Sequence, residues 1–292
     1  MIPRKKLIVG LAPFTEEYLN FNNENISKQK LKDLIKFLNK KKLFYYDTAL
    51  IYKNVENKII NTKSLKKKIK VITKFILPKK PNMDDEKKII QSLILSLKNL
   101  KLKKFEGVLI HNPWDINSSN IFFLKKLMRK ITKEKITHKI GVSVYTLSEF
   151  NNLKKYFLPK IVQIPFNILN TEFDNTRFKN LIKKNKIEIH ARSIFLKGVL
   201  LKKNFSLSKI KYKKLHQKLV YINQYSQKKK ISKIELLVNF VFSHKFIDKI
   251  VVGFMSKKEI AEFLSINIKK HNFNKLKSYL PREEVDPRLW SI

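Results

Sequence analysis

The chain has 292 residues, of which 43% are hydrophobic, so it can bury a large core in one large domain or two small ones. It contains no cysteine, which excludes a disulfide framework and any metal site built from thiolates. Its formal net charge of +41 raises nucleic acids and anionic membranes as possible partners.

Short apolar runs recur along the chain and predict β-strands. Most of them contain no alternating polar residues, which is typical of strands buried on both faces of a parallel sheet. The predicted strands are 7–11, 43–47, 70–73, 105–110, 139–144, 161–164, 187–193 and 249–252.

Amphipathic stretches with helical spacing lie between these runs. The predicted helices are 27–42, 85–100, 120–135, 147–156, 175–185 and 256–266, with two more in 207–244 that are divided near Ser232. Ser27 and Ser256 are the expected N-caps of the first and last of them.

Strands and helices alternate throughout, and no linker rich in glycine, proline or serine interrupts them. We therefore expect an α/β fold in which residues 1–292 form a single (β/α)8 barrel, also called a TIM barrel. The alternative is an open, doubly wound sheet, which is usually shorter or divided between two domains.

The N-terminal sequence MIPRKKLIVGLAPF is expected to form a strand, because its apolar run is short, contains a proline and lacks a small-residue cleavage site. No run of about 18 apolar residues follows, so no membrane span is expected. With no cysteine in the chain, we expect a cytoplasmic protein.

The high positive charge is best interpreted as compositional bias. Only six of the 64 basic residues are arginine, and the lysines are spread along the whole chain. Recognition of bases and phosphates favours arginine, usually gathered in one region. We therefore expect no specific nucleic-acid partner, although a basic surface would still attract anionic cofactors.

Several common binding motifs are excluded. The five glycines all lie far apart in sequence, which rules out a G-x-G-x-x-G fingerprint and a phosphate-binding P-loop. The histidines show no paired zinc-ligand spacing, so no metal site is expected.

Four ionisable residues fall at the ends of three consecutive predicted strands: Asp47 and Tyr52, Lys74, and His111. In a barrel of this type the chemistry lies at the carboxyl ends of the strands. Each residue alone has an ordinary structural explanation, such as packing or turn capping. Together they form a possible acid–base group, because a lysine paired with an aspartate favours ionisation of a neighbouring tyrosine, and a histidine can hold a carbonyl oxygen.

The sequence around these residues resembles the aldo-keto reductase family. YDTALIYKNVEN is similar to its D-T-A signature with a following Tyr and Glu, VITKF to its lysine strand and LIHNP to its histidine strand. KIGVSVYT, IVQIPFNIL, IHARSIFLKGVL and IVVGFMSKKEIAEFL are similar to its strands five to eight, and DPRLW resembles the ending of bacterial members.

The resemblance implies an oxidoreductase that binds NADPH, or less often NADH, across the mouth of the barrel and reduces a small-molecule carbonyl substrate. Tyr52 would be the proton donor, Lys74 paired with Asp47 would tune it, and His111 would orient the substrate. The implied cofactor-binding residues are Ser143, Gln163, Asn167 and Arg192 near the nicotinamide, and Gly253, Ser256 and Glu262 near the phosphates and adenosine.

Some positions depart from the family pattern. Arg192 stands where an aromatic residue often stacks on the nicotinamide; it could stack through its plane or pair with a carboxylate or phosphate. Lys257 and Lys258 are the nearest cations where many NADPH-preferring members have an arginine, which leaves the choice between NADPH and NADH open.

Two alternative functions and the identity of the substrate remain open at this point. The same fold could serve a regulatory protein that binds the nucleotide with little turnover, and the charge alone would suggest nucleic-acid binding. The substrate is expected to be a sugar-derived or short-chain carbonyl compound. Aromatic residues that would line an apolar cleft, unless they simply pack, are Phe14, Tyr18, Trp114 and Trp290.

Overall fold

Eight parallel strands form a closed barrel in the computed structural model, which describes residues 1–15, 27–52, 55–56, 69–202 and 211–290. The strands neighbour one another in chain order, and β8 closes the barrel beside β1, where Leu7 is in register with Ile250. They are β1 (Leu7–Gly10), β2 (Tyr45–Asp47), β3 (Lys70–Phe75), β4 (Gly107–Ile110), β5 (Ile140–Ser143), β6 (Ile161–Pro165), β7 (Glu188–Arg192) and β8 (Lys249–Val252).

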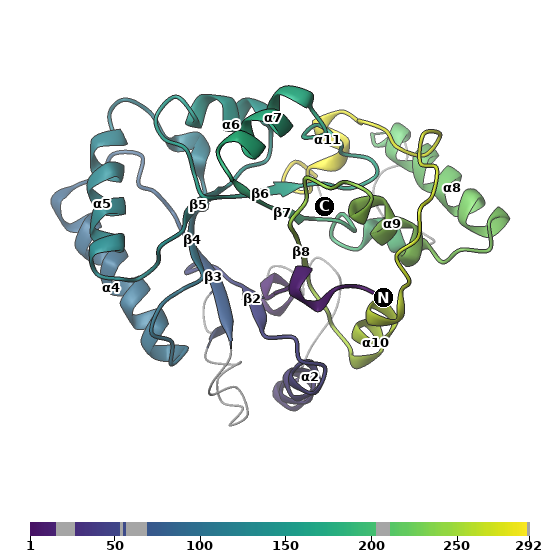
Figure 1. The fold of residues 1–292 in the computed structure, drawn as a ribbon, viewed down its shortest axis with the longest axis horizontal. Helices are drawn as coiled ribbons and strands as arrows, with labels where there is room; N and C mark the ends of the chain where they lie inside the picture. Colours follow the sequence, from purple (N-terminus) through teal and green to yellow (C-terminus); the bar gives the residue numbers. More distant parts are fainter. Residues whose placement is uncertain (16–26, 53–54, 57–68, 203–210, 291–292) are drawn as a thin grey trace.

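Helices surround this barrel on the outside (Figure 1). The α-helices are α2 (Lys28–Lys40), α4 (Met83–Asn99), α5 (Ile121–Lys133), α6 (Leu147–Leu153), α7 (Thr176–Lys184), α8 (Lys213–Lys228), α9 (Lys233–Phe242), α10 (Lys257–Ser265) and α11 (Arg282–Val285). Short 3-10 helices are η1 (Arg4–Lys6), η2 (Ala12–Phe14), η4 (Pro113–Asp115) and η5 (Val199–Leu201). The predicted (β/α)8 barrel is therefore confirmed.

The apolar strands fold this way because both of their faces are buried. Side chains that point inward fill the barrel axis, and they form a separate cluster of Ile8, Tyr45, Ile72, Leu109 and Ile161. Side chains that point outward pack against the helices in a second, larger core. Side chains thus fill the barrel interior below the mouth, and ligands of such barrels bind at the carboxyl ends of the strands.

Capping side chains fix where several helices begin. Ser27 accepts a hydrogen bond from Lys30 N, and Ser256 accepts one from Glu259 N, so both predicted N-caps are confirmed. Ser232 caps α9, which confirms the predicted division of the last helical stretch into α8 and α9.

An ionic cluster closes the amino end of the barrel, opposite the mouth. Glu188, the first residue of β7, contacts Lys139, Lys249 and the fully buried His190. Burial of His190 lowers its pKa, and the contacts with these three groups hold the pKa of Glu188 well below its usual range. Ion pairs therefore stabilise this end of the barrel, which is the face that serves stability in barrels of this type.

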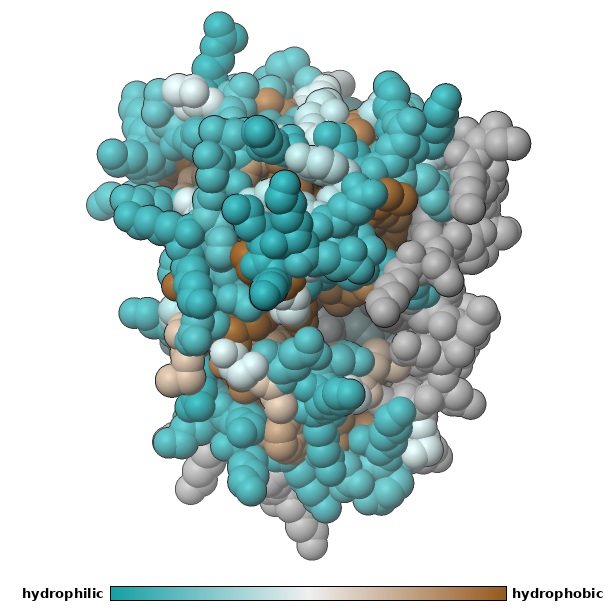
Figure 2. Space-filling model, turned by 90° about the vertical axis from the view of Figure 1, so that its right-hand side faces the viewer, coloured by the Kyte–Doolittle hydropathy of each residue, from teal (hydrophilic) through white to brown (hydrophobic). Residues whose placement is uncertain are grey.

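The face that carries α8 and α10 is mostly hydrophilic (Figure 2). Among the described residues, no helix is long and apolar enough to cross a membrane.

Candidate active site

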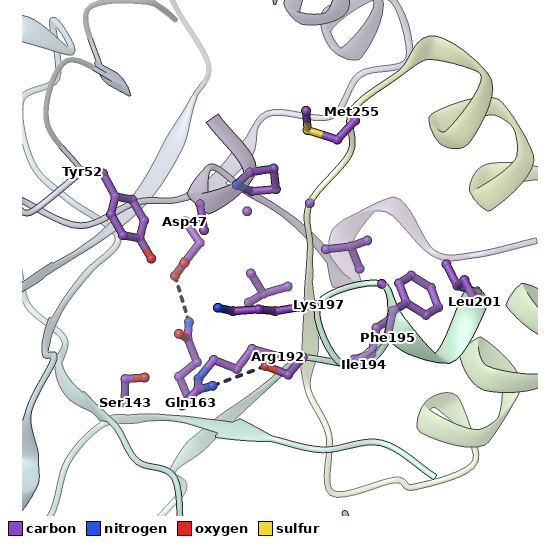
Figure 3. A pocket seen from close by; sticks show the side chains of 18 of the residues that line it. Asp47, Tyr52, Ser143, Gln163, Arg192, Ile194, Phe195, Lys197, Leu201 and Met255 are labelled. Carbon is purple, nitrogen blue, oxygen red and sulfur yellow. Dashed lines mark hydrogen bonds between the residues drawn. The ribbon is translucent and has the colours of Figure 1, made fainter. Parts of the chain in front are cut away.

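One cavity of about 400 Å³ opens at the carboxyl ends of the strands. The strand ends supply most of its polar lining: Asp47 from β2, Lys74 from β3, His111 after β4, Ser143 from β5, Gln163 from β6 and Arg192 from β7. Tyr52, from the loop after β2, faces the same space (Figure 3). Residues separated by up to 145 positions are therefore neighbours, as the parallel barrel requires.

Asp47 is the centre of a buried polar network. Its Oδ1 lies 2.5 Å from Lys74 Nζ, and its Oδ2 accepts a hydrogen bond of 2.8 Å from Gln163 Nε2. Lys74 Nζ also donates to the Thr48 carbonyl at 2.9 Å. Because both carboxylate oxygens are engaged, the network fixes the position of the Lys74 side chain.

Burial lowers the pKa of Lys74 from its ordinary value, and the charge of Arg192 lowers it further, while Asp47 opposes the shift. The Lys74 side chain is only 2% exposed, so water screens its charge little. Its Nζ lies 5.9 Å from the centre of the Tyr52 ring. A cation at this position favours the ionised form of the phenol.

His111 completes the group beside Tyr52. The two ring centres are 6.4 Å apart and the rings are nearly perpendicular, at 82°. Burial lowers the pKa of His111 to about 3, and the charges of Lys74, Arg192 and Arg288 add to this effect. The imidazole is therefore neutral near pH 7, so that one ring nitrogen carries a hydrogen to donate and the other does not.

Ser143 and Gln163 each offer a polar group that makes no hydrogen bond with another described residue. Ser143 is 2% exposed, and its hydroxyl makes no hydrogen bond with another described residue, although it lines the cavity. The Gln163 side-chain oxygen likewise accepts no hydrogen bond within the described part of the chain. A ligand with both an amide N–H and an amide oxygen would complement this pair.

The comparison with protein families decides what this barrel is: the aldo/keto reductase model matches residues 6–280. The chain belongs to the aldo/keto reductase family. Its members are oxidoreductases, so the predicted family and the predicted class of enzyme agree with the match. A comparison with curated proteins found no match.

Eight of the eleven predicted site residues of this aldo/keto reductase reach the cavity. Asp47, Tyr52, Lys74, His111, Ser143, Gln163, Arg192 and Gly253 line it. Asn167, Ser256 and Glu262 do not appear in its lining. The structure thus gathers the predicted catalytic group and part of the predicted cofactor-binding set.

The three residues outside the lining have local environments of their own. Asn167 is 1% exposed and braces the turn after β6, accepting from Leu169 N at 2.9 Å and donating to Ser193 O at 3.1 Å. Ser256 caps α10. Glu262 is exposed on α10. Their roles in cofactor binding stay predictions.

Sequence reasoning missed several residues that line the cavity. They come from the segment after β7, which includes η5, and from the segment after β8, which includes the first turn of α10: Ile194, Phe195, Lys197, Leu201, Lys202, Met255 and Glu259. Lys197 extends from its loop into the pocket (Figure 3). The rule that sites lie at the carboxyl ends of barrel strands, applied to the segment after Arg192, would have indicated this loop.

The aromatic residues expected near a substrate have different positions. Phe14 and Trp290 are buried in the core at 1% and 6% exposure, so they pack rather than line the cavity. Trp114 is 45% exposed and lies against Tyr145 and Arg288. Tyr18 lies outside the described residues.

Proposed function

We propose that the protein is an NAD(P)H-dependent reductase that converts an aldehyde or ketone into an alcohol. The observation that supports this most directly is the convergence of Tyr52, His111 and the Asp47–Lys74 pair on one cavity. Family membership alone gives an oxidoreductase; the four side chains give a specific way to reduce a carbonyl group.

Tyr52 is the proton donor in this proposal. The carbonyl carbon is reduced by hydride from the nicotinamide, which is the chemistry that NADPH or NADH supplies when bound. The electron pair of the C=O double bond moves to oxygen, which takes the proton from the Tyr52 hydroxyl. Lys74 stabilises the phenolate left behind, and Asp47 and Gln163 hold Lys74 in place.

His111 positions the substrate. As a neutral imidazole it can donate one N–H to the carbonyl oxygen without competing as an acid, because its pKa is lowered to about 3. A hydrogen bond to the oxygen polarises the carbonyl and stabilises the negative charge that develops there during hydride addition.

The polar groups at the mouth of the barrel suit a nicotinamide. The Ser143 hydroxyl and the Gln163 side-chain oxygen have no hydrogen-bond partner among the described residues, and they complement the two halves of its carboxamide. Arg192 lies beside them, and Gly253, Met255 and Glu259 line the side of the cavity formed by β8 and α10, toward which the rest of the dinucleotide would extend.

The test is direct. Purified protein is mixed with NADPH or NADH, and oxidation is followed by absorbance with a panel of aldehydes, ketones and sugars. Nucleotide binding is measured separately by fluorescence. We expect binding together with turnover of at least one carbonyl class. Tight nucleotide binding with no turnover across the panel would contradict the proposal and favour a regulatory role instead.

A further inference from the structure

The cavity wall carries more positive than negative charge. Among the described residues that line it, Lys74, Arg192, Lys197 and Lys202 are cationic, whereas Asp47 and Glu259 are the carboxylates. Asp47 is already paired with Lys74. Its charge is therefore already balanced and does not serve Arg192.

Arg192 is a half-buried cation of this wall, and no salt bridge joins it to a carboxylate of the described residues. Its guanidinium donates to the Val144 carbonyl at 3.1 Å and to Ser193 Oγ at 3.4 Å, and no described carboxylate lies within 4 Å. The arginines near the C-terminus differ, because Arg282 and Arg288 both pair with Asp286. A partly desolvated charge without an opposite charge nearby is costly, so an anionic ligand would stabilise this arginine.

The Arg192 guanidinium is held in place before any ligand binds. Its central carbon lies 4.0 Å from the centre of the Tyr145 ring. The same ring is contacted by Arg288, whose central carbon lies 3.0 Å from the ring centre. Asp286 fixes Arg288 in turn. This prior ordering means that little side-chain entropy is lost when an anion binds.

Arg192 is also close enough to the catalytic residues to influence them. Its charge contributes to the lowered pKa values of both Lys74 and His111. Figure 3 shows its side chain beside Gln163, on the side of the pocket away from Met255. An anion held by Arg192 would therefore lie next to the reacting carbonyl rather than along β8 and α10.

We propose that Arg192 binds an anionic group of the substrate, so that the preferred substrates are carbonyl compounds bearing a carboxylate or a phosphate. This inference rests on the proposed carbonyl reduction and adds the substrate class to it. The planar fork of a guanidinium matches either oxyanion with two parallel hydrogen bonds. A neutral aldehyde would offer this guanidinium no negative charge.

The experiment compares kcat/KM for matched pairs of substrates. Butanal is compared with 4-oxobutanoate, and glyceraldehyde with glyceraldehyde 3-phosphate, which separates the carboxylate from the phosphate. The variants are Arg192→Met, Arg192→Lys and, as a control, Arg177→Met, which changes an exposed arginine on α7. All assays are repeated at about 0.3 M NaCl, where general attraction by the basic surface is screened.

We expect the wild type to prefer at least one anionic substrate by roughly 30- to 100-fold, at low and high salt. Arg192→Met should reduce this ratio to near one, Arg192→Lys should restore part of it, and Arg177→Met should leave it intact. A wild-type ratio near one, with neutral aldehydes turning over, would overturn the inference and leave the proposed function standing.

Two other outcomes are also decisive. If Arg192→Met weakens dinucleotide binding but keeps the substrate ratio, Arg192 pairs with a cofactor phosphate and the inference is wrong. If no carbonyl compound is reduced by the wild type, the proposed function fails, and the substrate class fails with it.

Discussion

Asp47 and Lys74 compensate each other's charge in a place that water hardly reaches, with side-chain exposures of 7% and 2%. Removing one partner leaves the other charge buried and unpaired, which typically costs about 3–5 kcal/mol, whereas removing both costs much less. The pair is therefore best tested by changing both residues together.

We predict that Lys74→Met and Asp47→Asn each lower the free energy of unfolding, Lys74→Met by about 3–5 kcal/mol. The double variant should lose less stability than the two single losses added together. It should nevertheless be inactive, because Tyr52 has lost its neighbouring cation. Urea unfolding at pH 7 measures the free energy of unfolding of the three variants. Additive losses would show that the two residues are not coupled.

His111 should make the fold sensitive to acid. Its pKa is about 3 in the folded protein and ordinarily 6.5, so only the unfolded chain takes up this proton as the pH falls below 6.5. The folded state is therefore destabilised between about pH 6.5 and pH 3, by at most about 1.4 kcal/mol per pH unit from this group.

We predict that His111→Asn makes the free energy of unfolding less dependent on pH in this window. His138→Asn, which changes an exposed histidine, is the matched control and should keep the wild-type slope. Urea unfolding at several pH values from 4.5 to 7.5 measures the slope. An unchanged slope in His111→Asn would mean that the imidazole is protonated in the folded state.

At the scale of elements, two glycines on adjacent strands let the barrel interior close. A Cβ on Gly141 would lie 2.4 Å from the Ile161 carbonyl oxygen and 2.5 Å from a Leu109 methyl group. A Cβ on Gly107 would instead meet the end of the Ile161 side chain, at 2.6 Å. The first clash is with backbone and cannot be relieved by rotating a side chain.

We therefore predict that Gly141→Ala destabilises the protein more than Gly107→Ala does. Overpacking of this kind typically costs about 1–3 kcal/mol, and Gly141→Ala should lie at or above the upper end of that range. Thermal unfolding of both variants provides the comparison. Equal losses would show that strand β5 can shift away from β6 at little cost.

The barrel could be predicted from sequence because most strands are continuous apolar runs, and the carboxyl-end rule then brought Asp47, Lys74 and His111 together. Strand ends were less predictable: the strand expected at 105–110 begins at Gly107. Phe105 is buried although it lies before the strand. An apolar residue gives the same sequence signal in a strand and in the turn that precedes it, so the sequence could not separate the two.

The cofactor-binding side was harder to predict. Asn167 and Ser256 are short polar residues at turns, where the same side chain can bind a ligand or cap the backbone, and in both the backbone role is visible. That no described carboxylate lies within 4 Å of Arg192 could not be predicted either, because it depends on which residues are neighbours in space.

For the whole molecule, a net charge of +41 implies strong repulsion among lysines at the surface. Repulsion within a compact state destabilises it, and salt screens that repulsion. The hydrophilic face in Figure 2 and the spread of lysines along the chain are consistent with charge that is distributed rather than concentrated at one binding site.

We predict that raising NaCl from about 0.02 to 0.3 M increases the melting temperature by roughly 2–6 °C, which corresponds to about 1–2 kcal/mol for a chain of this size. Duplex DNA binding, if present at low salt, should disappear at physiological salt. Tight DNA binding that survives 0.15 M salt would contradict the interpretation of the charge as compositional.

The proposed role of the Tyr52 hydroxyl is tested most directly by single-turnover reduction with cofactor already bound. Tyr52→Phe removes only the proton donor, and Tyr221→Phe, on the exposed side of α8, is the matched control. The account predicts that Tyr52→Phe slows hydride transfer at least about 10²–10⁴-fold while the dissociation constant for the dinucleotide stays within about twofold. A transfer rate equal to that of the wild type would contradict it.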